Sequence, residues 1–309
     1  MKKILKLFLI FIIIIIALAV VIFCYFFIGS VPEAKNITWG VDFSQSQAEY
    51  LKLDWKETYS AIIKDLGTKN IKLHTNWNWV EGKRNDFYFS DIDWQIQQAE
   101  AKNVSIIYVL GMKTGRWPEC HAPAWVNGLS EEDQKAEVLK YITQVVQRYK
   151  DSKVITYWQV ENEPLFNFGL CPTWYYKNDD FLKAEVALVK SLDPSRPIII
   201  SDSGDLSFWF GVAKIGDIVG ITMYKKIWIN MEDKFGFAMD YFFSPITYWR
   251  KIGFIDKFFG KKVICIELQA EPWLSKPFNS TPLSEQEKSM NLNQFNLLYS
   301  KLNYQQRKA

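Results

Sequence analysis

The chain has 309 residues, which is enough for one large domain or for two ordinary ones. Its formal net charge is +3, and neither sign of charge runs in blocks, so nothing in the sequence indicates a nucleic-acid partner. Aromatic residues make up 16% of the chain, an excess that fits either a large core or flat apolar surfaces for a ligand such as a sugar ring.

The N-terminus places Lys2, Lys3 and Lys6 before an uncharged apolar run from Leu7 to Ile28. This run is long enough to cross a hydrocarbon core of about 30 Å. A cleaved signal peptide has a shorter apolar region, and Gly29-Ser30 is a poor cleavage site. The sequence therefore favours an uncleaved membrane anchor over a cleaved signal. The lysines favour a cytoplasmic N-terminus, with everything after residue 30 outside.

Strand-like and helix-like segments alternate from residue 36 to residue 303, with no internal repeat and no linker between them. Most of the expected strands are near-continuous apolar runs, as in a parallel sheet that is covered on both faces. The expected strands are Ile37–Phe43, Ile71–Thr75, Val104–Leu110, Val154–Val160, Pro197–Ser201, Ile218–Thr222 and Val263–Ile266.

The expected helices fall between these strands, and three of them begin with a capping residue three positions before an acid, at Asp54, Ser130 and Ser284. The first has an apolar stripe that Gly67 is placed to end. The other helices are expected at Asp91–Lys102, Glu131–Tyr149, Asp179–Ser191, Tyr241–Phe258 and Ser284–Leu302.

This alternation is typical of parallel α/β folds, either a barrel or a doubly wound sheet. A doubly wound nucleotide-binding protein should carry a glycine-rich phosphate loop after its first strand. The first strand instead continues as Gly40-Val41-Asp42-Phe43-Ser44, which contains no such motif. The sequence therefore favours a (β/α)8 barrel over a doubly wound sheet.

Functional residues of such barrels gather at the carboxyl ends of the strands, and polar groups and tryptophans follow several of the expected strands here. Residues at or beyond strand ends are Asn76 and Trp79 after the second strand, Trp117 and His121 after the third, Glu161-Asn162-Glu163 after the fourth, Tyr224 after the sixth, and Glu267 and Trp273 after the seventh. We expect these residues to surround one pocket.

Glu163 and Glu267 end strands that lie nearly opposite each other in an eight-stranded barrel. Paired carboxyl groups across a gap are what the cleavage of a glycosidic bond requires, because one must be protonated and the other ionised. A separation of about 5–5.5 Å would make the second carboxylate a nucleophile and retain the configuration. We interpret Glu161 as a supporting residue in a polar network, and Glu81 and Glu271 as loop or rim residues.

The stretch Asn162-Glu163-Pro164 ends the fourth expected strand, and the lone glutamate Glu267 ends the seventh. Together they resemble the large clan of retaining (β/α)8 glycoside hydrolases that includes cellulases, mannanases and β-galactosidases. The pattern Trp77-x-x-x-Glu81, followed by Phe87-Tyr88-Phe89 and Asp91, is similar to a motif after the second strand in several of these families. The resemblance runs from about residue 37 to residue 300.

The resemblance implies a role for each matching residue. Glu163 would be the general acid/base and Glu267 the nucleophile, while Asn162 would bind the sugar 2-hydroxyl and Tyr224 would orient Glu267. It implies no metal or organic cofactor. His74 and His121 are the only histidines and lack metal-ligand spacing. Further substrate contacts are expected from Asn76, Trp79, Trp117, His121 and Trp273.

Cys120 and Cys171 lie in loops that follow neighbouring strands, in a compartment that would be oxidising. The sequence therefore predicts a disulfide between them, with two unpaired thiols as the alternative. Cys24 lies in the apolar N-terminal run and Cys265 in an apolar strand, where a free buried thiol is expected.

Only seven strands are expected, because the helix over Ser284–Leu302 is followed by a short polar segment. Related enzymes continue into an eighth strand. The first and seventh strands would then have unpaired edges, and a gap would open in the barrel wall. Three explanations remain open: a miscount, another segment or chain that fills the gap, or truncation. We favour truncation, which predicts marginal stability and weak activity.

The domain organisation follows as a cytoplasmic tail over 1–6, a transmembrane signal-anchor over 7–28, a linker over 29–36 and a glycoside hydrolase barrel over 37–309. The predicted function is the cleavage of a β-linked glycan with retention, with an oligo- or polysaccharide and the membrane as partners. Two alternatives remain open: a transglycosylase, and a catalytically weak glycan-binding protein on the same fold.

Overall fold

The structure, a computed structural model, describes residues 2–33, 36–177, 179–224, 226–231, 235–240 and 245–268. Three expectations lie outside the described residues: the helix over Ser284–Leu302, the positions of Glu271 and Trp273, and the stretch after the seventh strand in which an eighth would be sought.

Seven parallel strands form one sheet in the order β1-β2-β3-β4-β5-β6-β9, which confirms the expected parallel α/β fold. The first begins four residues later than expected, because residues 36–40 lie exposed on the surface. The strands are β1 (Val41–Phe43), β2 (Asn70–His74), β3 (Ser105–Leu110), β4 (Ile155–Val160), β5 (Ile198–Asp202), β6 (Ile218–Met223) and β9 (Lys262–Leu268).

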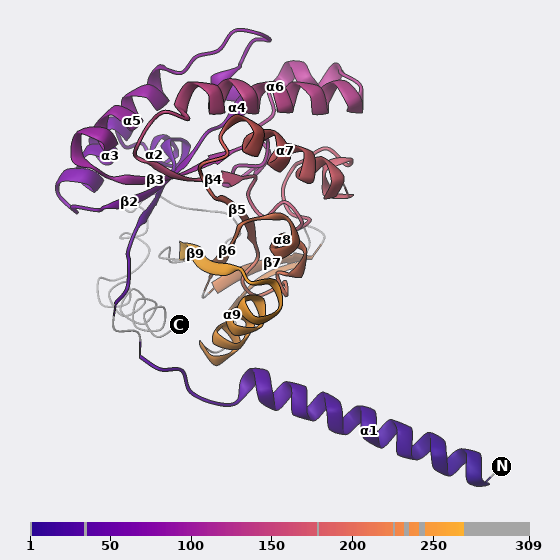
Figure 1. Cartoon of the computed structure of the whole chain (residues 1–309). Coiled ribbons are helices and arrows are strands. Elements are labelled where there is room, and N and C mark those ends of the chain that lie inside the picture. The colour runs from indigo at the N-terminus through magenta and orange to yellow at the C-terminus, as the bar shows by residue number, and fades with distance from the viewer. Residues whose placement is uncertain are drawn as a thin grey trace.

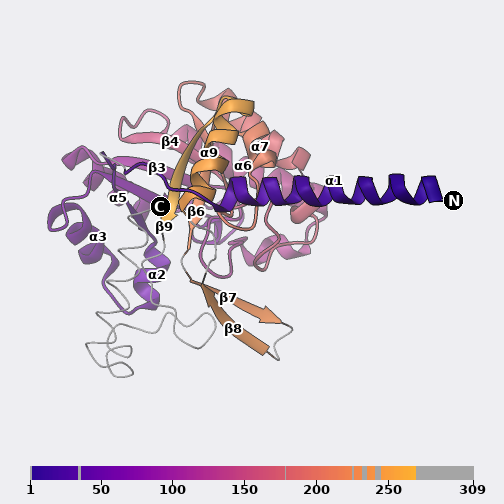
Figure 2. The same cartoon turned by 90° about the horizontal axis from the view of Figure 1, so that it is seen from below.

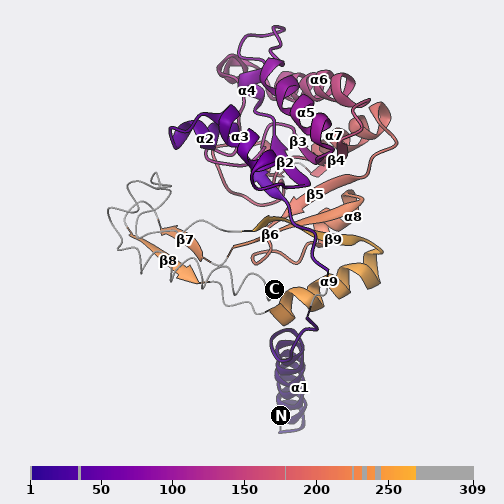
Figure 3. The same ribbon diagram turned by 90° about the vertical axis from the view of Figure 1, so that its left-hand side faces the viewer.

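The sheet is strongly curled, as a barrel requires (Figures 1 and 3). Lys72 on β2 and Glu267 on β9 lie in ion-pair contact, with 2.6 Å between Nζ and Oε1. Their strands stand five positions apart in the sheet order, so only a curled sheet brings the two side chains together. Within the described part of the chain, no strand joins β1 to β9.

Helices cover the outer face of the curled sheet (Figures 1 and 2). Two of the three predicted caps lie among the described residues and are present, since the Asp54 side chain accepts from the Glu57 amide at 2.8 Å and Ser130 from the Asp133 amide at 3.2 Å. The main helices are α3 (Trp55–Lys64), α5 (Ser90–Lys102), α6 (Glu131–Tyr149), α7 (Asp179–Leu192) and α9 (Pro245–Phe259).

Several short elements were not predicted from the sequence. They are the helices α2 (Gln45–Tyr50), α4 (Trp77–Val80) and α8 (Phe210–Ile215), and an antiparallel hairpin of β7 (Lys226–Met231) and β8 (Phe235–Asp240). Helices of four to six residues are too short to show a helical repeat of apolar positions, which is why the pattern did not reveal them. The hairpin follows β6 and precedes α9 in the sequence. In space it projects away from the sheet (Figure 2).

The alternating directions of side chains along β4 separate the core from the site. Trp158 is fully buried on the helix side, where its ring packs edge-on against Tyr108 at 5.5 Å and its Nε1 donates to Asp193 at 2.9 Å. Burying a tryptophan of roughly 200 Å² contributes about 5 kcal/mol before entropic costs. Gln159, the next residue, donates to Ser201 at 3.2 Å on the inner side of the sheet.

The N-terminal helix α1 (Lys2–Phe27) extends away from the barrel as a single rod (Figures 1 and 3). It is long and apolar enough to cross a membrane by length and composition. Its last turn contacts α9, because Thr247 Oγ1 donates to the carbonyl oxygen of Phe26 at 2.8 Å.

Candidate active site

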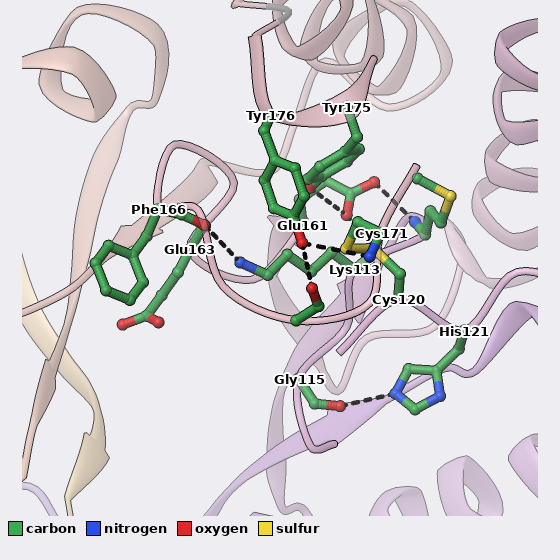
Figure 4. The surroundings of a disulfide bond; sticks show 12 residues. Lys113, Gly115, Cys120, His121, Glu161, Glu163, Phe166, Cys171, Tyr175 and Tyr176 are labelled. Atoms are coloured by element: carbon green, nitrogen blue, oxygen red, sulfur yellow. Dashed lines mark hydrogen bonds between the residues drawn. A yellow bond between two sulfur atoms is a disulfide. The ribbon is translucent and has the colours of Figure 1, made fainter. Parts of the chain in front are cut away.

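The strand β4 ends at Val160, and the chain then turns out of the sheet. Glu161 and Glu163 both have left-handed backbone conformations, with φ of 60° and 45°. The simple alternation of an ideal strand therefore does not continue, and the two carboxyl groups reach different surroundings. Figure 4 shows Glu163 directed away from the disulfide and Glu161 beside Tyr175 and Lys113.

Glu163 is held by groups from two neighbouring strands. Thr222 Oγ1 on β6 donates to its Oε1 at 2.9 Å, and its own amide donates to Ser201 Oγ at 2.7 Å. Burial raises the pKa of Glu163 to about 8, and the negative charge of Glu267 adds to this effect. Glu163 is therefore protonated at neutral pH.

Glu267 lies next to Glu163, because its strand position pairs with Thr222 in the β6–β9 register. The two oxygens of Glu267 have different partners: Lys72 Nζ lies 2.6 Å from Oε1, and the Tyr224 hydroxyl donates to Oε2. Burial would lower the pKa of Lys72, but the carboxylates of Asp42 and Glu267 outweigh it and raise the pKa above its usual value. Lys72 is therefore charged and forms an ion pair with Glu267.

A second acid stands behind this ion pair. Asp42 on β1 lies 3.5 Å from Lys72 Nζ and is hydrogen-bonded to Nε2 of His74, whose Nδ1 contacts the carbonyl oxygen of Thr114. Burial would raise the pKa of Asp42, but its interactions with His74 and with the charged Lys72 outweigh it and hold the pKa well below its usual range. Lys72 therefore has two carboxylate partners in the interior of the sheet.

Lys113 connects the loop after β3 to the loop after β4. Its buried Nζ donates to the carbonyl oxygens of Glu163 at 2.9 Å and Phe166 at 3.0 Å (Figure 4). Burial lowers the pKa of Lys113, although the acids around it oppose that effect. The predicted disulfide between Cys120 and Cys171 is confirmed and ties the same two loops, with a Cα–Cα distance of 5.2 Å.

Glu161 is fully buried behind Glu163, which agrees with the supporting role predicted for it. It accepts hydrogen bonds from the amides of Met112 and Lys113 and, at 2.9 Å, from the Tyr175 hydroxyl. Glu185 on α7 is also fully buried, and neither of its carboxyl oxygens has a hydrogen-bond partner among the described residues. Burial raises the pKa of both acids, and the charge of Glu161 raises that of Glu185 further.

Asn76 and Trp79 line a pocket beside His74, together with Tyr88. The Trp79 side chain is 41% exposed, so part of its ring is free to contact a ligand. Asn76 Oδ1 accepts from Thr114 Oγ1 at 3.2 Å, which links this pocket to the loop after β3.

The remaining predicted contacts are more dispersed. Trp117 is 53% exposed and packs against Phe168, whose ring centroid is 6.1 Å away. His121 is buried, and its Nε2 is bonded to the carbonyl oxygen of Gly115 at 2.9 Å, so in this structure it stabilises the loop. Trp273 lies outside the described residues.

The Trp77-x-x-x-Glu81 motif has a structural explanation. Trp77 Nε1 donates to Glu81 Oε2 at 2.9 Å, and the Asn85 amide donates to the other carboxylate oxygen at 2.8 Å. Glu81 lies just after α4, in agreement with the predicted loop position, but it is fully buried and therefore not at the rim. The four-residue spacing places both side chains on one face of α4, where the acid satisfies a buried indole N–H.

Sequence reasoning missed five residues of the site: Asp42, Lys72, Lys113, Glu119 and Thr222. Lys72 had a usable signal, because a charge inside a buried strand must be paired. Glu119 had none, since it lies in an irregular loop; it is buried beside Asn162, and burial raises its pKa. Within the described ranges, no group of three or more acids, histidines and cysteines is arranged to hold a metal ion.

A curled parallel sheet with one glutamate after β4 and a lysine-paired glutamate on its last described strand is the arrangement expected of the clan of retaining (β/α)8 glycoside hydrolases, and the family match places the protein in that clan. The model of glycosyl hydrolase family 10 matches residues 33–187, just over half of the chain. The chain belongs to glycosyl hydrolase family 10.

Several solved structures are similar to this chain at low sequence identity. The native xylanase 10B from Thermotoga maritima is 13% identical with a TM-score of 0.53, over 81% of this chain and 74% of that one. A glycosylated endo-β-1,4-xylanase from Gloeophyllum trabeum is 19% identical (TM-score 0.48, 62% and 63% covered). A β-galactosidase from the psychrophilic Marinomonas ef1 is 11% identical (TM-score 0.44, 64% and 43% covered). The last two matches span less than two-thirds of those enzymes.

Proposed function

We propose that the protein hydrolyses a β-linked glycan with retention of configuration, with Glu163 as acid/base and Glu267 as nucleophile. The observation that carries this proposal is the difference between the surroundings of the two acids. Glu163 is half-buried, accepts a hydrogen bond from the neutral Thr222 hydroxyl and has a pKa of about 8, whereas Glu267 faces the Lys72 ammonium. One proton donor and one charge-paired carboxylate are what the reaction requires.

In the first step, Glu163 gives its proton to the leaving oxygen while Glu267 attacks the anomeric carbon and forms a glycosyl ester. In the second, the ionised Glu163 takes a proton from water, which hydrolyses that ester. Glu267 loses its negative charge when the ester forms. Asp42 then remains beside Lys72, so the buried ammonium keeps a carboxylate partner throughout the cycle.

Tyr224 and Lys72 are positioning residues in this scheme, because each binds one oxygen of Glu267 and together they fix the carboxylate plane. Asn162, adjacent to Glu163, is proposed to contact the sugar 2-hydroxyl. The pocket lined by Asn76, Trp79 and Tyr88 is proposed as a sugar subsite, since it combines an aromatic surface with polar groups. Xylan is the first substrate to test, because the Thermotoga maritima protein of similar fold is a xylanase.

The test uses the full chain in detergent with aryl β-xylosides and β-xylobiosides. Glu163→Ala should keep much of its glycosylation rate on a dinitrophenyl glycoside, whose leaving group needs no proton, and should lose activity on xylan. Glu267→Ala should lose both. A 2-fluoro sugar should add one glycosyl mass to the peptide that contains Glu267.

Equal loss of glycosylation in both variants would contradict the assignment of roles. Full activity of either variant would show that the site lies elsewhere. An intact, folded protein that binds xylan but turns over none of the aryl glycosides would support a glycan-binding protein instead.

We also propose that α1 anchors the barrel to a membrane, with residues 1–6 cytoplasmic, 7–28 spanning, 29–36 linking and 37–309 outside. The support is the length and composition of α1 and the lysines before it. Extraction should require detergent, and protease added from outside should digest the barrel. A soluble form that begins near Ser30 would show instead that the segment is cleaved.

A further inference from the structure

The C-terminal end of α1 packs against α9 (Figures 1 and 3). Thr247 Oγ1 donates to the Phe26 carbonyl oxygen at 2.8 Å, and the Arg250 guanidinium lies 4.3 Å from the centre of the Tyr25 ring. The first turns of α9 therefore lie where the chain would leave the bilayer.

The face of α9 that contacts α1 continues beyond that contact. Thr247, Arg250, Phe254 and Phe258 are spaced three, four and four residues apart, so they share one side of the helix. At about 1.5 Å per residue, Phe258 lies roughly 16 Å along the axis from Thr247. Its side chain is 62% exposed, which is unfavourable for a phenylalanine in water.

An exposed aromatic cluster surrounds this end of α9. The Phe254 ring lies 4.3 Å from Phe258 and 5.1 Å from Phe210 of α8, and Phe210 stacks on Phe208 at 5.7 Å. Phe208 is 64% exposed. We call Phe208, Phe210, Phe254 and Phe258 the aromatic surface.

Basic side chains accompany the aromatic surface. Lys257 Nζ lies 5.7 Å from the centre of the Phe258 ring, and Lys214 is exposed one helical turn after Phe210. Asp256 is the single acid of α9, whereas Arg250 and Lys257 are basic residues on its outer side. Aromatic rings with adjacent lysines are typical of segments that lie at the headgroup level of a membrane.

We propose that the aromatic surface binds the outer face of the bilayer that α1 spans. This contact would fix the orientation of the barrel relative to the membrane. This inference rests on the proposed anchoring by α1. Insertion of the exposed rings removes apolar area from water, and an anionic lipid surface attracts the adjacent basic residues. Continuity with the α1 contact favours lipid over a second protein as the occupant.

The test is nitroxide accessibility in the full chain, reconstituted in liposomes of phosphatidylcholine and phosphatidylglycerol. The free thiols are first removed as Cys24→Ala and Cys265→Ala, and labels are then attached to Phe258→Cys and, separately, Phe208→Cys. The matched control is Glu132→Cys, which is exposed on α6 at the opposite end of the barrel from α9 (Figures 1 and 3).

Labels at 258 and 208 should collide with a water-soluble nickel complex roughly threefold less often, and with oxygen more often, than the label at 132. Values equal to those at position 132 would overturn the proposal, as would protection from both reagents with spin–spin broadening, which would indicate a second copy. Failure of the protein to float with the liposomes would overturn the anchoring itself.

Discussion

Lys72 Nζ lies 2.6 Å from Oε1 of Glu267, although the residues belong to strands five positions apart in the sheet. The side chain of Lys72 is 3% exposed, so its charge depends on protein partners. This pair therefore links two regions of the curled sheet across its interior and sets the electrostatic environment of the proposed nucleophile.

Lys72→Met should destabilise the protein by roughly 3–5 kcal/mol, because it leaves Asp42 and Glu267 as neighbouring, partly buried acids without their cation. It should also lower kcat by about 100-fold, since Glu267 loses one of its two positioning contacts. Chemical denaturation and xyloside kinetics measure the two effects.

The matched control is Lys69→Met, one residue before β2, where the lysine is exposed. It should change the free energy of unfolding by less than about 0.5 kcal/mol. The double variant Lys72→Met/Glu267→Gln should lose roughly 1–3 kcal/mol less than the sum of its single variants. Additive losses would show that the ion pair contributes nothing to stability.

The raised pKa of Glu163 predicts that two kinds of substrate differ in how their rates depend on pH. Hydrolysis of xylan should fall about tenfold per pH unit above pH 8, because the acid/base loses its proton, whereas glycosylation by an activated aryl glycoside should not follow that limb. A limb shared by both substrates would assign the titration to another group.

Glu163 also makes stability depend on pH. Because its folded pKa of about 8 exceeds the usual 4.5, its contribution to stability is complete below pH 4.5 and is lost as the pH rises to about 8. Glu163→Gln should therefore gain roughly 1–2 kcal/mol at pH 8, or about 2–8 °C in Tm, and little at pH 4. An equal change at both pH values would contradict the burial of an ionisable group.

The two buried acids Glu161 and Glu185 predict a second variant whose effect on stability depends on pH. Both folded pKa values are raised, so the stability that the pair contributes is present at acid pH and lost as the pH rises through those values. Glu185→Gln supplies an amide donor to Glu161 and should stabilise the protein at pH 8 by roughly 1–3 kcal/mol.

Two controls accompany this variant. Glu185→Ala should destabilise the protein at every pH, because it leaves a cavity beside Tyr175 and Phe181. Glu132→Gln, on the exposed side of α6, should leave the pH profile unchanged. A profile of Glu185→Gln identical to the wild type would show that the two acids do not interact.

The parallel α/β fold was predictable because a strand buried on both faces must be apolar along its length, as in Val154–Val160. The Glu163/Glu267 pair was also predictable, since charged residues directly after such strands gather at one edge of a parallel sheet. The resemblance to the glycoside hydrolase clan then indicated the roles of the two glutamates, which composition and spacing alone do not reveal.

Other features depend on contacts that no local pattern encodes. The divergence of Glu161 from Glu163 arises from left-handed backbone conformations, and the proximity of Glu161 to Glu185 arises from the packing of α7 against β4. The supporting role of Lys113 arises from a loop that folds back onto Glu163. Periodicity reports which face of an element is apolar, but it does not report how two loops meet.

The Cys120–Cys171 disulfide should contribute about 4 kcal/mol, because it closes a segment of 51 residues in the unfolded chain. Cys120→Ser/Cys171→Ser should lower the free energy of unfolding by that order. It should also lower kcat more than it raises KM for xylan, because the bridge ties the loop that carries Lys113 to the loop that carries Glu163. The matched control is Cys265→Ser, whose free thiol lies outside the bridge. Denaturation of the wild type with and without reductant should reproduce the loss, and unchanged stability under reduction would show that packing alone holds the two loops together.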